Sequence, residues 1–294
     1  MRRGAPETER RALFYAALGY LSFVAYGSLV PLDFHDRPFH EAWAQFAHIP
    51  YLNLGVGERA DWVANVVLYV PLAYLSSAWL ARDKTGVFGT WLRATWVFFL
   101  CAVVAVGVEF TQIYFPPRTV SLNDIVAELI GSAIGIAAWH VAGGRLSSLW
   151  QTVKAGGPSA VRAALTLYLL SYLAISFFPY DFLVSWSELA AKLATHRDSV
   201  VISSNSCASA VRCAAKLGLE ILAVVPLGIL VGMLSTGDRQ ARMRAALLWG
   251  GLLGLLIEGV QLFLASGIAQ GISVLTRAAG AGLGVILHQR LPLR

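Results

Sequence analysis

Eight long apolar segments dominate this 294-residue chain. A helix needs about 20 mostly apolar residues to cross the hydrocarbon core of a bilayer. Inside a bilayer the backbone N–H and C=O groups must be satisfied within the protein, so such segments fold as helices. We therefore predict an all-α fold, a polytopic membrane helical bundle with about eight transmembrane helices: 12–32, 62–81, 92–114, 124–141, 163–179, 217–234, 245–265 and 272–289.

The charged residues lie in short clusters between these segments. They make up 14% of the chain, against about 25% in soluble domains, and the short connections leave no room for a soluble domain. The net charge of +6 would suit a nucleic-acid partner, but membrane topology explains it better, because Lys and Arg accumulate in cytoplasmic loops. If the N-terminus is inside, the inner segments hold about twice as many Lys and Arg as the outer ones. We predict that both termini are cytoplasmic and that the chain binds no nucleic acid.

One stretch, residues 109–135, places several polar side chains close to predicted membrane depth. An ionisable residue in a membrane helix costs about 2.5–3.5 kcal/mol on insertion scales. A membrane protein that keeps such residues uses them in a site or pairs them to hold its helices together. The candidate polar site takes these residues and two from the preceding predicted helix: Asp61, Asn65, Glu109, Gln112, Arg118, Asp124 and Glu128.

Helical spacing places these side chains on shared faces. Asp61 and Asn65 are four residues apart, which puts them on one side of a helix. The helix near residue 124 opens with a polar run in which Ser121 or Asn123 can serve as the N-cap. A stripe then steps by four, three and four residues: Asp124, Glu128, Gly131 and Gly135. Its two glycines form a G-x-x-x-G motif, which allows close helix contact in membranes, so the two carboxylates face a neighbouring helix.

The second half of the chain repeats landmarks of the first half with an offset of about 150 residues. The repeated motifs are S-x-x-P-x-D-F, V-P-L, E-x-x-Q and G-x-x-x-G, in the same order. We predict two domains, a four-helix repeat over residues 1–150 and a second, degenerate four-helix repeat over 151–294. A Gly- and Ser-rich cytoplasmic connection at 143–159 separates them. Each repeat has an even number of spans, so the two are parallel repeats.

The second repeat has lost most of the acidic residues. Arg277 stands where the first repeat has Glu128, and Ser273 stands where it has Asp124. An arginine at that depth needs a partner, and Glu258 or Glu220 can supply one. We interpret the second repeat as mainly structural. Its counterparts of the candidate site are Glu220, Glu258, Gln261 and Arg277.

Cysteine and motif content limits the chemistry. Cys207 and Cys213 lie in a predicted outer segment, where they could form a disulfide if the chain turns between them, while Cys101 suits a packing role. The His and acidic residues of the first outer loop match no metal-ligand spacing, so we predict no metal and no cofactor. The chain contains no P-loop, G-x-S-x-G, C-x-x-C or H-E-x-x-H motif, which leaves the corresponding enzyme classes without support.

Taken together, the motifs resemble the VanZ-like family of bacterial membrane proteins. The resemblance rests on Asp61-x3-Asn65, Glu109-x2-Gln112, Arg118 and Asp124 followed by the glycine pair, and covers about 30–138 well and 176–287 in degraded form. Glu128, where the family usually has Asn, and Ala73, where it often has Gly, depart from the pattern. The family is named for an accessory protein of teicoplanin resistance. The resemblance implies the bacterial cytoplasmic (inner) membrane, a cell-envelope role and a link to glycopeptide antibiotic resistance.

Three functions fit these residues. The polar site could bind or act on a lipid-linked, envelope-precursor or glycopeptide-related molecule at the outer leaflet. Arg118 would then hold a phosphate, and a carboxyl group would work as acid or base. The residues leave open whether such a site catalyses a reaction or only binds. Alternatively, the two repeats could form a transporter or flippase. In the third interpretation the polar cluster only holds the helices together. The partners we predict are the lipid bilayer and such a ligand, and the sequence does not determine the oligomeric state.

Overall fold

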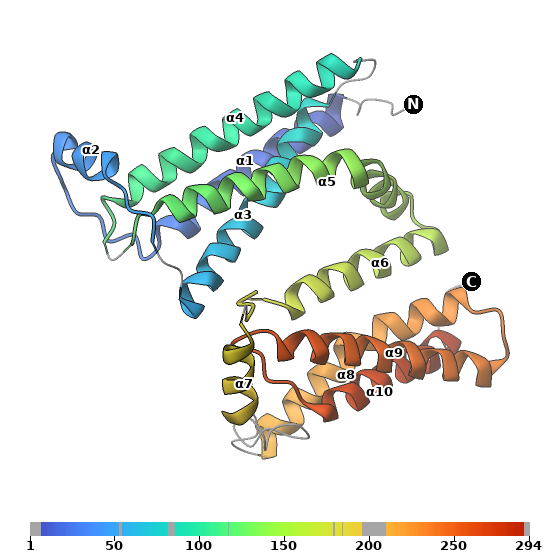
Figure 1. Cartoon of the computed structure of the whole chain (residues 1–294). Helices are drawn as coiled ribbons and strands as arrows, with labels where there is room; N and C mark the ends of the chain where they lie inside the picture. Colours follow the sequence, from blue (N-terminus) through green and yellow to red (C-terminus); the bar gives the residue numbers. More distant parts are fainter. Residues whose placement is uncertain are drawn as a thin grey trace. The chain divides into compact units, whose positions relative to one another are not determined.

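The computed structural model describes residues 7–52, 55–81, 86–116, 118–178, 180–183, 185–195 and 210–290. Within these ranges the chain is helical, with no strand beyond an isolated bridge pair between Phe182 and Leu264. The helices are α1 (Glu7–Leu29), α2 (Phe39–Ala47), α3 (Val56–Leu80), α4 (Val87–Gln112), α5 (Leu122–Ala155), α6 (Gly157–Ser176), α7 (Trp186–Thr195), α8 (Ala210–Leu234), α9 (Arg239–Leu262) and α10 (Gly271–Arg290) (Figure 1).

Eight of these helices are long and apolar enough to cross a membrane, all except the short α2 and α7. This confirms the predicted all-α fold with eight membrane spans. The apolar segments are helical because a bilayer offers the backbone no other hydrogen-bond partners. The chain is therefore a multi-pass membrane protein.

The chain divides into two compact units, Met1–Ser147 and Ser148–Arg294. The connection expected at 143–159 is wrong in its detail, because α5 continues as a helix to Ala155. Only Gly156 separates α5 from α6, and it has a φ of 78°. Glycine reaches this left-handed region without steric cost, so the helix ends at that residue rather than at the earlier glycines.

In the first unit, α1 and α4 both pack against α3. A core of buried residues fills the space between these three helices: Val24, Tyr69, Leu72, Ala73, Val97, Cys101 and Ala105. Cys101 is a free, buried thiol, which agrees with its predicted packing role. The short α2 packs beside α4 through rings of Phe39, Trp43 and Phe46 that contact Phe110.

Two glycines let α5 approach α3 closely. A Cβ atom on Gly131 would lie 2.1 Å from the carbonyl oxygen of Val66, and one on Gly135 would lie 2.3 Å from that of Val70. Both distances are far below van der Waals contact, so only glycine fits at either position. The contact predicted from G-x-x-x-G is therefore present, and it brings the acidic face of α5 against α3.

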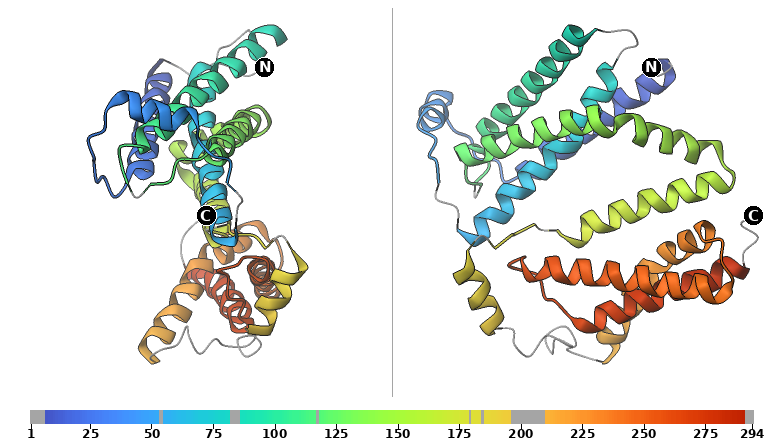
Figure 2. Two further views of the ribbon diagram at one scale, coloured as in Figure 1. Left: turned by 60° about the vertical axis from the view of Figure 1, so that its left-hand side comes forward. Right: turned by 45° about the vertical axis from the view of Figure 1, so that its right-hand side comes forward.

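The second unit is built around α8, α9 and α10, which pack against one another, with α6 against α8 (Figure 2). Its core contains Val224, Val231, Ala246, Ala281 and Val285. The short α7 is tied to the end of α9, because the Lys192 ammonium group donates to the carbonyl oxygens of Gln261 and Leu264. Burial lowers the pKa of Lys192, and the nearby carboxylate of Asp181 opposes that shift.

Candidate functional site

A polar cluster forms where α3, α4 and α5 of the first unit meet. The Asn65 amide on α3 donates to Asp124 Oδ1 on α5 at 2.8 Å. The Ser121 hydroxyl donates to Asp124 Oδ2 at 2.7 Å, and the Asp124 backbone N–H donates back to the Ser121 oxygen at 3.2 Å. Ser121 is therefore the N-cap of α5, one of the two residues that the sequence proposed for that role.

Glu109 joins this cluster from α4. Its Oε2 accepts the backbone N–H of Ser121 at 3.2 Å, and its side chain is buried, with the residue 1% exposed. This bond fixes the start of α5 to the end of α4. Asn123 holds the same end of α5 to the segment that precedes α3. Its side-chain oxygen accepts the Leu52 backbone N–H at 2.7 Å, and its amide donates to the Leu52 carbonyl at 3.0 Å.

Gln112 and Arg118 bind the end of α1 instead of the carboxyl groups. The Gln112 amide donates to the Ser28 carbonyl at 3.1 Å, and the Arg118 Nε donates to the same oxygen at 2.8 Å. Arg118 Nη2 donates to the Gly27 carbonyl at 3.0 Å. The C-terminal carbonyl groups of a helix lack intrahelical partners, so these side chains serve as a C-cap for α1. The charge of Arg118 still acts on Glu109.

Glu128 lies one turn deeper on α5 and is 1% exposed. It interacts electrostatically with the carboxyl groups of Glu109 and Asp124 and with the Tyr69 hydroxyl. Its Oε2 and the Tyr69 hydroxyl lie close enough to act on each other, but neither atom makes a hydrogen bond of good geometry in the described part of the chain. A buried polar atom without a well-formed hydrogen bond costs free energy. Glu128 and Tyr69 therefore have hydrogen-bonding capacity that a ligand could use.

The structure thus brings together Asn65, Glu109, Asp124 and Glu128, with Gln112 and Arg118 alongside. Asp61 is separate, because it is exposed and makes no hydrogen bond or ion pair with the cluster among the described residues. Tyr69 was missed by the sequence analysis, since a tyrosine in an apolar helix looks like any core residue. Among the residues that the structure describes, no group of three or more His, Cys, Asp or Glu has a geometry suited to a metal ion. Cys207 lies outside the described residues, so the disulfide with Cys213 stays a prediction.

The second unit pairs its buried charges. Arg277 Nη1 lies 2.5 Å from Glu258 Oε1, and Arg277 Nε donates to the Tyr172 hydroxyl at 3.2 Å. Glu258, not Glu220, is thus the partner of Arg277. Glu220 instead accepts hydrogen bonds from Ser273 at 3.2 Å and Thr276 at 2.8 Å. Gln261 lies near this group on α9, where its backbone oxygen binds Lys192.

Several contacts recur in the two units. Glu109 accepts the backbone N–H of the residue twelve positions later, and Glu258 does the same with Gln270. Asn65 binds Asp124, and Glu220 binds Ser273, at the corresponding positions. A Cβ atom on Gly280 would lie 2.2 Å from the Ile221 carbonyl oxygen, as one on Gly131 would lie 2.1 Å from that of Val66. The main difference is that an arginine in the second unit stands where the first has Glu128.

We expect Ser121→Ala to lower the free energy of unfolding by about 0.5–2 kcal/mol. The substitution removes the N-cap of α5 and one hydrogen bond to Asp124. Denaturant titration of the purified protein in detergent measures the change. Ser22→Ala is the matched control, because the Ser22 hydroxyl binds only the Leu18 carbonyl of its own helix. Equal effects of the two substitutions would contradict the capping role.

Comparison with known proteins finds a family match within the first unit. Residues 12–143 match the family model VanZ/LLP1, which covers the whole polar cluster and confirms the resemblance seen in the sequence. No curated protein and no solved structure matches the chain.

Proposed function

We propose that this VanZ-like membrane protein binds, through the polar cluster of its first unit, the headgroup of a lipid-linked or envelope-precursor molecule at the outer leaflet. One observation supports this function most. Three carboxyl groups, those of Glu109, Asp124 and Glu128, lie together at the junction of three helices, and Glu128 retains an oxygen without a well-formed hydrogen bond in the described chain.

The chemistry of these groups favours a ligand rich in hydrogen-bond donors. Each carboxyl group offers acceptor oxygens, and the hydroxyl or amino groups of a saccharide or lipid headgroup can donate hydrogen bonds to them. Asn65 and Asp124 are partly exposed, while Glu109 and Glu128 are buried. We therefore place the entrance at Asn65 and Asp124 and the deeper contacts at Glu128.

Arg118 has a different role from the one first considered. Two of its donors are already bound to the Ser28 and Gly27 carbonyl groups. Arg118 is therefore better suited to fix the end of α1 beside the cluster than to bind a phosphate through two donors of its guanidinium group. Its charge lies close enough to act on Glu109. Arg118 then limits the repulsion among the carboxyl groups while leaving them free to bind.

We further propose that the two units are tandem copies and that only the first binds a ligand. The recurring contacts support a common ancestry of the units. In the second unit the guanidinium group of Arg277 is bound to Glu258 and Tyr172, so the acceptors that would face a ligand are used within the protein. This internal pair suits a unit with a structural role.

Native mass spectrometry of the full chain, purified from its membrane, tests the proposed ligand. We expect a retained envelope lipid in the wild type and its loss in Glu109→Gln and in Glu128→Arg. The second substitution copies the arrangement of Arg277 and Glu258 and supplies the cluster with an internal cation. Glu58→Gln, in the exposed first turn of α3, is the matched control and retains the lipid.

Two outcomes contradict the proposal. If folded Glu128→Arg protein retains the same lipid as the wild type, the ligand binds elsewhere. If no variant and no wild-type sample retains a lipid, and Glu109→Gln unfolds in detergent, the cluster serves to hold α3, α4 and α5 together. Arg118→Ala separates its two roles, since loss of the α1 cap lowers the unfolding temperature whether or not a ligand binds.

A further inference from the structure

A second candidate binding site lies at the C-terminal end of α3, whereas the polar cluster involves the N-terminal half of that helix. A cavity of about 620 Å³ opens between the beginning of α1 and the end of α3. Six residues line it: Glu7, Arg10, Arg11, Phe14, Tyr15 and Trp79. Because α1 and α3 are both candidate membrane spans, the first turns of one and the last turns of the other lie at the membrane surface.

The charges at the rim of the cavity are not balanced. Arg11 Nη2 lies 3.0 Å from Glu7 Oε1, so these two exposed side chains form an ion pair. Arg10 makes no hydrogen bond or ion pair with any part of the chain that the structure describes, and it is exposed. One positively charged guanidinium group is therefore available at the rim.

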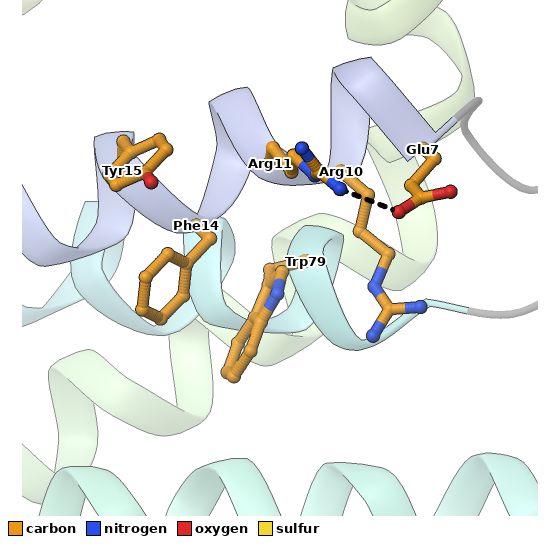
Figure 3. A pocket seen from close by; sticks show the side chains of 6 residues that line it. All are labelled: Glu7, Arg10, Arg11, Phe14, Tyr15 and Trp79. Atoms are coloured by element: carbon orange, nitrogen blue, oxygen red, sulfur yellow. Dashed lines mark hydrogen bonds and ion pairs between the residues drawn. The ribbon is translucent and has the colours of Figure 1, made fainter.

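The floor of the cavity is aromatic. The rings of Phe14 and Trp79 lie 5.1 Å apart between their centroids, across the two helices. In Figure 3, Arg10 and Phe14 point from α1 toward α3 on either side of Trp79, while Arg11 turns to Glu7. Exposed apolar side chains continue along α1 from the cavity, with Tyr15 67% and Leu18 46% exposed.

We propose that this cavity binds an anionic phospholipid of the leaflet at which α1 begins. The phosphate accepts hydrogen bonds from Arg10, whose planar fork matches its oxygens. The glycerol region lies on Trp79, an amphipathic ring that favours the depth of the headgroups, and an acyl chain follows Phe14 and Leu18. A basic pocket between transmembrane helices is a known way of recognising lipid headgroups. This site is independent of the carboxyl cluster and its ligand.

Glu7 lowers the affinity of the site for anionic lipids and makes it selective for the charge of the headgroup. Its carboxylate neutralises Arg11 and repels a second negative charge, so the site suits a headgroup with a single phosphate charge. Glu7→Gln releases Arg11, which then becomes a second donor to the phosphate. Substitutions of Arg10 and Glu7 are therefore expected to change lipid affinity in opposite directions, which a purely structural role of the cavity would not produce.

The test uses the full chain in phosphatidylcholine nanodiscs with a minor fraction of phosphatidylglycerol, and counts bound lipid by native mass spectrometry. Arg10→Ala is expected to lower the affinity for phosphatidylglycerol about fivefold. This corresponds to the attraction of about 1 kcal/mol that one basic residue near an anionic membrane surface contributes. Glu7→Gln is expected to raise the affinity, and Trp79→Leu to lower it. Arg239→Ala, which removes an exposed charge from the first residue of α9, is the control and leaves it unchanged.

The outcomes are distinct. Equal loss in Arg10→Ala and Arg239→Ala would show that general surface charge attracts the lipid and would overturn the site. Inorganic phosphate that competes as well as the lipid would also overturn it, because an anion alone would then account for binding. Arg10 is exposed and makes no hydrogen bond or ion pair in the described chain, so its variant is expected to fold. The envelope ligand that depends on Glu128 is retained in Arg10→Ala, which separates this site from the proposed function.

Discussion

Gly131→Ala is expected to destabilise the first unit more than any other single-methyl change in it. The new Cβ atom would lie 2.1 Å from the Val66 carbonyl oxygen, so α5 must move away from α3. Overpacking of this kind costs about 1–3 kcal/mol. The movement also separates Asp124 from Asn65 and weakens the polar cluster. The unfolding transition of the purified variant in detergent, compared with the wild type, measures the cost.

Two further glycine variants sharpen this test. Gly107→Ala on α4 has nothing within 4 Å of its new Cβ atom, so it is expected to be neutral or to stabilise by up to about 1 kcal/mol through helix propensity. Gly280→Ala meets the Ile221 carbonyl at 2.2 Å and is expected to behave like Gly131→Ala. If Gly131→Ala were as stable as Gly107→Ala, the close contact between α3 and α5 would be wrong.

Arg277→Met is expected to lower the free energy of unfolding by about 3–5 kcal/mol, the usual cost of breaking one side of a buried ion pair. Arg277 is 5% exposed and Glu258 is 8% exposed, so the substitution leaves a carboxylate buried without its cation. It also removes the donor to the Tyr172 hydroxyl. Denaturant titration of the variant in detergent measures the loss.

The double variant Arg277→Met, Glu258→Gln provides the control. It removes both charges and keeps an acceptor for the Gln270 backbone N–H, which binds Glu258 in the wild type. Replacing a whole buried ion pair by neutral groups is often close to neutral in free energy, so we expect most of the lost stability to return. A double variant as unstable as Arg277→Met would mean that the arginine acts through packing and not through its charge.

The membrane architecture could be predicted from the sequence because it depends on the composition of each segment alone. The free energy of moving a helix into a bilayer is a sum over its own residues, and no long-range contact is needed to evaluate it. The eight spans were found for this reason. The end of α5 was not, because the glycines near residue 143 remain helical and the conformation of Gly156 decides where the helix stops.

The sequence by itself also determined which helix faces carry polar side chains, since helical spacing puts Asn65, Glu109 and Asp124 on faces that can meet. It included Asp61, which lies apart from the cluster, and it missed Tyr69. Only the tertiary structure decided how each one is bound. Arg118 reaches the end of α1 across 90 residues, and Arg277 binds Glu258 rather than Glu220. Among the described residues, Glu128 keeps an oxygen without a well-formed hydrogen bond. A hydrogen bond depends on distances of a few tenths of an ångström between segments far apart in the chain, and the packing of whole helices sets those distances.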